Sequence, residues 1–127
     1  MPLTISTRDV EGIGIVNLEG RLARGEASEA LRSQIKHMLA IGTRKIVLNM
    51  DQISFLDSAG LSALVTAQHS AQSQTATLKL CSLGATLQNI LEATKLSEAF
   101  EIFGSETAAI LSFRDSAANP DGTTSGR

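Results

Sequence analysis

The sequence predicts an α/β domain with a mixed sheet of about five strands. An N-terminal antiparallel hairpin is followed by parallel strands, and about four helices are expected to pack mainly on one face. The prediction follows from the order of segments, because β-branched runs alternate with runs that have apolar residues at helical spacing. Hydrophobic residues make up 43% and charged residues 19% of the 127 positions, which suits one packed domain but not two.

The first two strands are predicted from β-branched runs separated by a turn signal. Residues 3–10 alternate loosely between apolar and polar side chains, and residues 13–20 form a second such run. Glu11 and Gly12 lie between them, as in a hairpin turn. We therefore expect an antiparallel hairpin whose first strand lies at an edge of the sheet, followed by a loop at residues 21–25.

An amphipathic helix and a buried strand follow the hairpin. Residues 26–40 carry an apolar stripe at helical spacing that is broken only by Gln34, and Gly42 supplies a stop signal. Residues 45–50 place apolar side chains on both faces, which is typical of a central strand. The strand is expected to end there, with residues 51–56 forming a turn.

A second helix is predicted from residue 58 to about residue 72. The helical spacing of i, i+3, i+4 and i+7 is carried by Leu61, Leu64, Val65 and Gln68. Ser58 stands between the preceding turn and this helix, in the place where a helix takes its N-cap residue.

The last part of the chain continues the alternation of strands and helices. Its predicted elements are a strand with one buried face at 77–81, a helix from 85 that closes at 96–99, a strand at 100–103, and a helix from 106 to about 114 with Ser105 as its cap. Residues 1–114 are thus predicted to form the domain. Residues 115–127 have no large apolar side chain and are expected to form a flexible tail.

The composition argues against several classes of function. Aromatic residues make up 3% of the chain and the formal net charge is −2, so neither base stacking nor a basic surface favours nucleic-acid binding. Cys81 is the only cysteine, which fits a reducing compartment. Neither a signal peptide nor an apolar run of about 20 residues is present. We expect a soluble, cytoplasmic protein.

The sequence lacks the motifs of common catalytic and cofactor sites. It has no glycine loop for a nucleotide phosphate, and Leu56 stands where a G-x-S-x-G nucleophile elbow has its first glycine. His37 and His69 fall on predicted helices without paired ligand spacing, so surface positions are expected rather than a metal site. Cys81 alternates with Leu80 on a strand and is interpreted as a structural thiol. No cofactor is predicted, and the chain is not expected to be an enzyme.

The start of the second predicted helix leaves two interpretations open. In the first, Ser58 is only a cap that contributes about 1 kcal/mol, and Asp57 is a favourable charge near the helix N-terminus. In the second, the segment is a functional site. Gly60 in the first helical turn costs up to ~1 kcal/mol relative to Ala, which indicates a close backbone approach. Phe55 and Leu56 also place large apolar groups beside an exposed hydroxyl.

A resemblance to the STAS domain, found in bacterial anti-sigma factor antagonists, is carried by the run Ile53-Ser54-Phe55-Leu56-Asp57-Ser58-Ala59-Gly60-Leu61. Residues 18–22 resemble the second strand of the family, residues 45–51 its third strand, and residues 83–103 its closing helix and strand. The resemblance covers about residues 3–113. One position departs from the family pattern, because Ala23 stands where many members carry an Asp.

The resemblance implies a regulatory protein-binding module. Family members bind an anti-sigma serine kinase and so free a sigma factor. The kinase phosphorylates the serine of the motif, and a phosphatase restores it. Ser58 is the matching residue here and is favoured over Ser54 and Ser62 as the phosphorylation site. The expected partner-binding residues are Asp57, Ser58, Ala59, Gly60, Phe55, Leu56, Arg21 and Arg24.

Two other functions remain open. The first is a STAS subunit of another assembly, such as a signalling complex or a cytoplasmic component associated with a transporter, because one fold serves many partners. The second is a small enzyme with Ser58 as its nucleophile. That function is disfavoured because His69, the nearest candidate base in the sequence, lies about three helical turns from Ser58.

Overall fold

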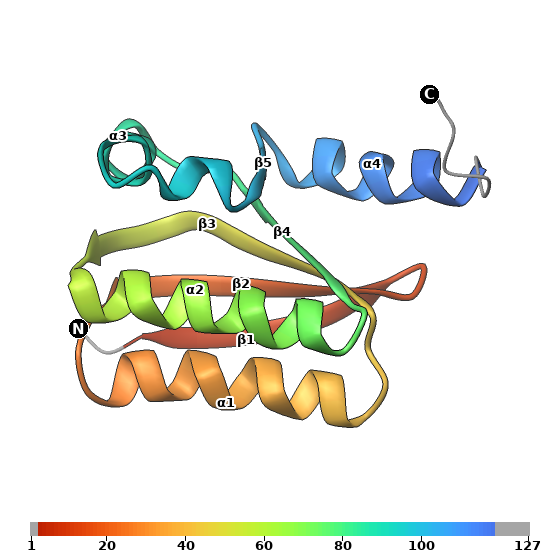
Figure 1. Cartoon of the computed structure of the whole chain (residues 1–127), viewed down its shortest axis with the longest axis horizontal. Coiled ribbons are helices and arrows are strands. Elements are labelled where there is room, and N and C mark those ends of the chain that lie inside the picture. Colours follow the sequence, from red (N-terminus) through yellow and green to blue (C-terminus); the bar gives the residue numbers. More distant parts are fainter. Residues whose placement is uncertain (1–2, 119–127) are drawn as a thin grey trace.

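The computed structural model describes residues 3–118, with the backbone alone described for residues 115–118. Five strands form one sheet in the order β1-β2-β3-β4-β5, with β1 and β2 antiparallel and every later pair parallel (Figure 1). The elements are β1 Thr4–Val10, β2 Ile13–Leu22, α1 Glu26–Ala40, β3 Lys45–Leu56, α2 Ser58–Ser73, β4 Thr77–Cys81, α3 Ala85–Ala93, a 3-10 turn Leu96–Glu98, β5 Glu101–Phe103 and α4 Glu106–Ala118. The predicted mixed sheet, its hairpin and its central third strand are confirmed.

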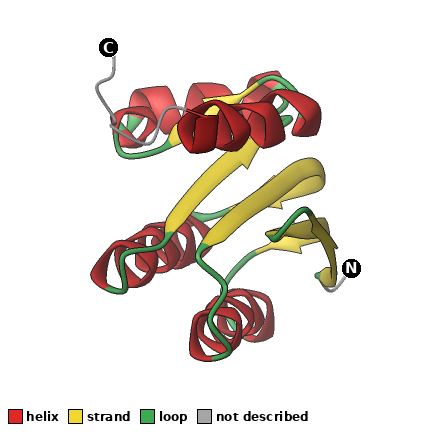
Figure 2. Ribbon diagram, turned by 90° about the vertical axis from the view of Figure 1, so that its right-hand side faces the viewer, coloured by secondary structure: helices red, strands yellow, loops and turns green. Residues whose placement is uncertain are grey.

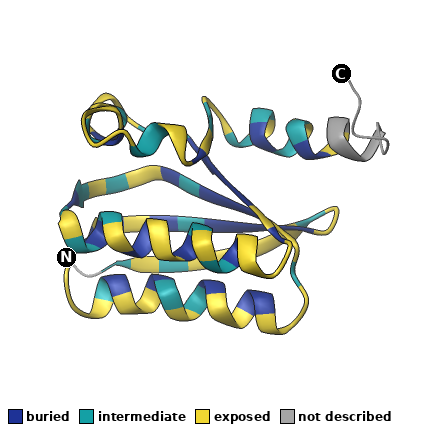
Figure 3. Ribbon diagram, in the orientation of Figure 1, coloured by how far each residue is buried: buried dark blue, intermediate teal, exposed yellow. Residues whose placement is uncertain are grey.

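Figure 2 shows the twisted sheet with helices on either side of it, and the apolar clusters divide the helices unequally between its two faces. Helices α1, α2 and α3 contribute to the larger apolar cluster, which also contains Val16, Leu48 and Leu80 from the neighbouring strands. Helix α4 covers a smaller cluster on the opposite face. In Figure 3 the buried residues of α1 lie on the side that faces the sheet. The expectation that helices pack mainly on one face is confirmed, and α4 is the exception.

Strands β2 and β3 are longer than predicted. We expected β2 to end at Gly20 and a turn to occupy residues 51–56. Instead, Arg21 pairs with Phe55 and Leu22 with Leu56, and the pairing carries irregularities that shift its register. A bulge adds a residue to one strand and restores the correct face further along. The extension carries both strands up to the start of α2.

Strand β4 is buried on both faces, contrary to the single buried face predicted for it. Lys79 and Cys81 point to the face that α4 covers, and both are buried. The Lys79 ammonium donates to Ser112 Oγ at 2.6 Å and lies 4.0 Å from the centroid of the Phe113 ring. Burial lowers the pKa of Lys79, with the Glu101 carboxylate acting in the opposite direction.

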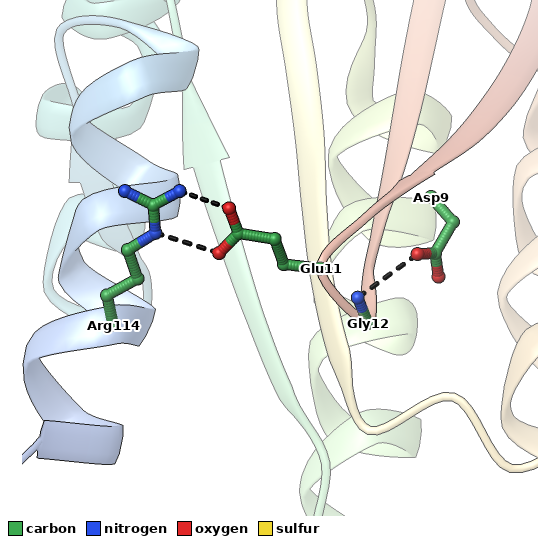
Figure 4. Close-up of polar contacts among 4 residues, drawn as sticks. All are labelled: Asp9, Glu11, Gly12 and Arg114. Carbon is green, nitrogen blue, oxygen red and sulfur yellow. Dashed lines mark hydrogen bonds and ion pairs between the residues drawn. The ribbon is translucent and has the colours of Figure 1, made fainter.

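Helix α4 is held to the hairpin by ion pairs at both ends. Arg114 Nε donates to Glu11 Oε1 at 2.8 Å, and its Nη2 pairs with the other oxygen of the same carboxylate (Figure 4). At the other end, Arg8 pairs with Glu106, which also accepts from Asn49 at 3.0 Å. The predicted cap at Ser105 is confirmed, because its hydroxyl accepts from the Ala108 amide at 3.1 Å.

The last helix ends later than predicted, at Ala118 instead of about Arg114. Helix α4 continues through Ala118, so the first residues assigned to a flexible tail, 115–118, are helical. Alanines among them favour continuation of the helix. The rest of the predicted tail, residues 119–127, lies outside the described residues.

Candidate functional site

The segment singled out in the sequence lies at the carboxyl end of β3, where α2 begins. Strands β2 and β3 are parallel, so their carboxyl ends meet at one edge of the sheet. The loop after β2, residues 23–25, therefore lies beside the start of α2. Ligand and partner sites of α/β sheets gather at this edge, because the loops that leave the strands are free to vary there.

Asp57, and not Ser58, is the N-cap residue of α2. Its Oδ1 accepts from the Gly60 amide at 2.9 Å, and its Oδ2 accepts from the Arg24 amide at 3.0 Å. The prediction that Ser58 occupies the cap was wrong by one residue, since Asp and Ser serve equally well as caps. The Asp57 carboxylate thus closes the first turn of α2 and ties it to the loop after β2.

The hydrogen bonds to Asp57 change its titration. Amide donors from Gly60 and Arg24, with smaller contributions from Ala59 and from the Arg24 charge, hold the pKa of the Asp57 carboxyl below its ordinary value. Desolvation acts in the opposite direction but is outweighed. Asp57 is therefore an ionised structural anchor at neutral pH.

The position of Gly60 leaves no room for a side chain. A Cβ at this position would overlap the carbonyl oxygen of Leu22 and lie 2.7 Å from Leu56 Cδ1. The backbone of α2 thus passes directly against the end of β2. The close approach inferred from a glycine in the first helical turn is present, and it fixes where Ser58 stands relative to the loop after β2.

The Ser58 side chain is exposed at the first helical position of α2. Within the described residues, its hydroxyl has no hydrogen-bond partner, whereas Ser54 Oγ donates to the Gly20 carbonyl at 3.1 Å. Ser62 is also exposed but lies one turn further into the helix. Of the three candidate hydroxyls, Ser58 is the one that stands open to solvent at the mouth of α2.

Four of the predicted partner-binding residues are buried or half-buried. Leu56 is buried, as is Gly60, while Ala59 and Phe55 are half-buried. The Phe55 ring is covered by the guanidinium of Arg21, whose Cζ lies 3.9 Å from the ring centroid. The exposed Ser58 thus follows an anionic cap residue, Asp57, and the Arg21 guanidinium covers the nearby Phe55 ring.

A groove of about 410 Å³ next to this site was missed in the sequence. It runs between the last part of β3 and the N-terminal half of α3, with Ile53, Phe55, Leu87 and Ile90 among its apolar side chains. The apolar side of α3 was visible in the sequence as helical spacing. Its position against β3 was not, because that contact joins segments some thirty residues apart.

Other candidate residues lie outside any site. His37 and His69 are exposed on α1 and α2, and Cys81 is buried, where burial raises the pKa of its thiol. Within residues 3–114, no cluster of His, Cys, Asp and Glu side chains is arranged to hold a metal ion. None of the helices in the described part of the chain has the length and hydropathy of a membrane span.

Replacement of Asp57 by Asn is expected to destabilise the fold at neutral pH by removing the charged acceptor. Because the folded pKa of Asp57 is lowered, the contribution of its charge is complete above about pH 4 and is lost as the pH falls through that lowered value. Urea unfolding of both proteins across this range should show their free energies converging on acidification. Asp51→Asn, at an exposed carboxylate on β3, is the matched control and should show little difference at neutral pH. A constant gap at all pH values would contradict the role of the charge.

Comparisons with solved structures place the fold among known proteins. An anti-sigma factor antagonist from Mycobacterium paratuberculosis is 20% identical, with 88% of this chain and 94% of that chain covered and a TM-score of 0.76. SpoIIAA, an anti-sigma factor antagonist, matches in its unphosphorylated form with 20% identity, 87% and 98% coverage and a TM-score of 0.68. The phosphorylated form of SpoIIAA from Bacillus matches with 19% identity, 84% and 96% coverage and a TM-score of 0.67.

A sulfate transporter family protein from Wolinella succinogenes shares the same fold, with 18% identity, 87% and 91% coverage and a TM-score of 0.71. Identities this low establish a similarity of fold alone, so an argument about function must come from the residues of the site. The model of the STAS domain matches residues 4–109, which is most of the sequence. The chain therefore belongs to the STAS domain family.

Proposed function

We propose that this protein is an anti-sigma factor antagonist that binds an anti-sigma serine kinase and is released when that kinase phosphorylates Ser58. The observation that carries the proposal is the separation of roles at the start of α2. Asp57 performs the capping, so the exposed Ser58 hydroxyl has no structural task in the described residues. Similarity to SpoIIAA, solved in unphosphorylated and phosphorylated forms, supports this reading.

In this phosphorylation reaction, the protein contributes only the Ser58 hydroxyl group as the acceptor. The kinase transfers the γ-phosphoryl group of ATP to Ser58 Oγ, the bond between the γ- and β-phosphates breaks, and ADP leaves. The hydroxyl proton passes to a base on the kinase, so this chain supplies the acceptor and no catalytic group. A phosphatase reverses the change by transferring the phosphoryl group to water.

The physical effect of the phosphate falls on binding more than on folding. It adds about −1.5 to −2 charges at the first position of a helix, where negative charge is tolerated. The cap at Asp57 and the contact at Gly60 do not involve the Ser58 hydroxyl. At an interface, however, a new doubly charged group facing an acidic or apolar surface weakens binding strongly.

Incubation with serine kinases from the same genome and ATP is expected to add one phosphate, which mass spectrometry should locate on Ser58. Ser58→Ala should abolish the labelling, while Ser62→Ala, at another exposed serine of α2, should leave it intact. Labelling of Ser54, or no labelling by any kinase of the genome, would contradict the proposal.

A STAS subunit of a transporter-associated assembly is the second candidate. The observation in its favour is the fold shared with a sulfate transporter family protein. The neighbouring genes separate the two candidates, because a kinase-like ATPase or sigma factor gene supports the first and a transporter operon supports the second. Purification of the protein with its bound partners provides the biochemical counterpart of this test.

A further inference from the structure

Two arginines beside Ser58 differ from the other arginines of the described chain. Each of the others uses its guanidinium in a polar contact. Arg8 pairs with Glu106, Arg32 with Glu29, Arg114 with Glu11, and Arg44 donates to the carbonyls of Leu39 and Thr43. Among residues 3–114, only Arg21 and Arg24 have guanidinium groups without a hydrogen bond or ion pair. The Arg24 charge acts on the Asp57 carboxylate, but neither guanidinium is committed to a hydrogen bond, so both can donate to an added anion.

The position of Arg24 brings its charge to the start of α2. Its backbone amide donates to Asp57 Oδ2 at 3.0 Å, and Ser58 is the next residue, with its Cα about 3.8 Å from that of Asp57. The long, exposed side chain of Arg24 is free to turn toward a group on Ser58. Arg21 lies further back, stacked on Phe55.

The helix N-terminus itself cannot serve a phosphate on Ser58 in the usual way. Free amides of a first helical turn commonly bind phosphate, but here the Gly60 amide already donates to Asp57 Oδ1. The Asp57 carboxylate also repels a second anion at this place. Because Asp57 already accepts from the Gly60 and Ala59 amides, side-chain donors are needed for a phosphate on Ser58.

We infer that Arg24, with Arg21 behind it, forms an anion-binding rim that receives the phosphate of phosphorylated Ser58. Both arginines are exposed. They also border a cavity of about 430 Å³ between the loop after β2 and the start of α1, which Asp57 and Ser58 do not line, and Glu26 is the one carboxylate among its described lining residues. Guanidinium groups bind phosphate through two parallel hydrogen bonds, which suits this role.

The inference rests on the proposed function and extends it to regulation. Before phosphorylation, the two guanidinium groups are available to acidic groups of a partner. After phosphorylation they are drawn to the phosphate of their own chain. One modification then removes cationic contacts from the interface and also introduces negative charge. The loss of affinity for the partner is therefore larger than charge repulsion alone would give.

The test uses the full chain with phosphoserine inserted at position 58 during translation, so that no kinase is required. Phosphorus NMR then gives the second pKa of the phosphate. Nearby cations lower this value, and the carboxylates of Asp57 and Glu26 raise it. Replacement of Arg21 and Arg24 by Gln is expected to raise it by about half a unit or more. The Arg24 Nε–H proton resonance should also shift between the Ser58 and phosphoserine proteins.

Lys45→Gln is the matched control, because it removes one positive charge at the exposed start of the 12-residue strand that ends beside the site. It should leave the phosphate pKa unchanged. The inference is overturned if the arginine replacements shift the pKa no more than this control, or if the Arg24 resonance does not respond to phosphoserine. The proposed function is tested separately by kinase labelling of Ser58. An absence of labelling would contradict that function but would not change the phosphate pKa measured in this experiment.

Discussion

Ser58→Asp is expected to weaken binding to the proposed partner, an anti-sigma kinase, by about 100-fold or more while the fold remains intact. A negative charge in an interface costs several kcal/mol when it faces an acidic or apolar surface, and each ~1.4 kcal/mol is a factor of ten in affinity. The same charge at the first position of α2 is compatible with the helix dipole. The Ser58 side chain is exposed, so no core contact is lost.

Titration calorimetry with the purified kinase and thermal unfolding of each variant measure the two effects separately. Ser62→Asp adds the same charge one helical turn further along the exposed surface of α2 and should bind far better than Ser58→Asp. Ser58→Ala should bind as well as the unmodified protein and persist in the complex in the presence of ATP. Unchanged binding by Ser58→Asp would show that charge at this position does not drive release.

The fold was predictable because local patterns and connectivity agree along most of the chain. Helix α1 and strand β4 begin and end where their apolar spacing places them. Strand β2 was predicted to end at Gly20 and strand β3 at Met50. The irregular pairing that carries both strands further joins segments that are distant in the sequence, so neither segment alone reveals it. The burial of Lys79 was missed for a similar reason, since only the position of α4 decides it.

At the candidate site, too, features that depend on neighbouring residues could be predicted from the sequence, and features that depend on distant segments could not. Gly60 indicated from the sequence that the backbone of α2 lies close to another segment, because a glycine inside a helix lowers stability unless there is a steric reason for it. The choice between Asp57 and Ser58 as the cap could not be made from residue types. It depends on the Arg24 amide, which arrives from the loop after β2, more than thirty residues earlier in the chain. That the guanidinium groups of Arg21 and Arg24 make no hydrogen bond in the described structure likewise follows only from the folded arrangement.

Gly60→Ala is expected to destabilise the protein by about 2–4 kcal/mol, although alanine is the better helix former. The added Cβ overlaps the Leu22 carbonyl oxygen, which belongs to the backbone of a central strand and has no flexible end to move away. Relief requires α2 to withdraw from β2. That movement strains the hydrogen bond between Asp57 and the Arg24 amide, which spans the same gap. The substitution is therefore expected to weaken kinase binding as well as stability, because it displaces Ser58 from the loop after β2.

Urea unfolding of Gly60→Ala and of Gly104→Ala separates this steric effect from the general effect of replacing a glycine. Gly104 is exposed, and a Cβ there meets no atom within 4 Å, so its replacement should change the free energy of unfolding by less than about 0.5 kcal/mol. Equal or greater stability of Gly60→Ala would mean that the start of α2 does not press against β2. That result would also remove the basis for placing Ser58 close to the loop that carries Arg24, because this placement depends on the contact between Gly60 and Leu22.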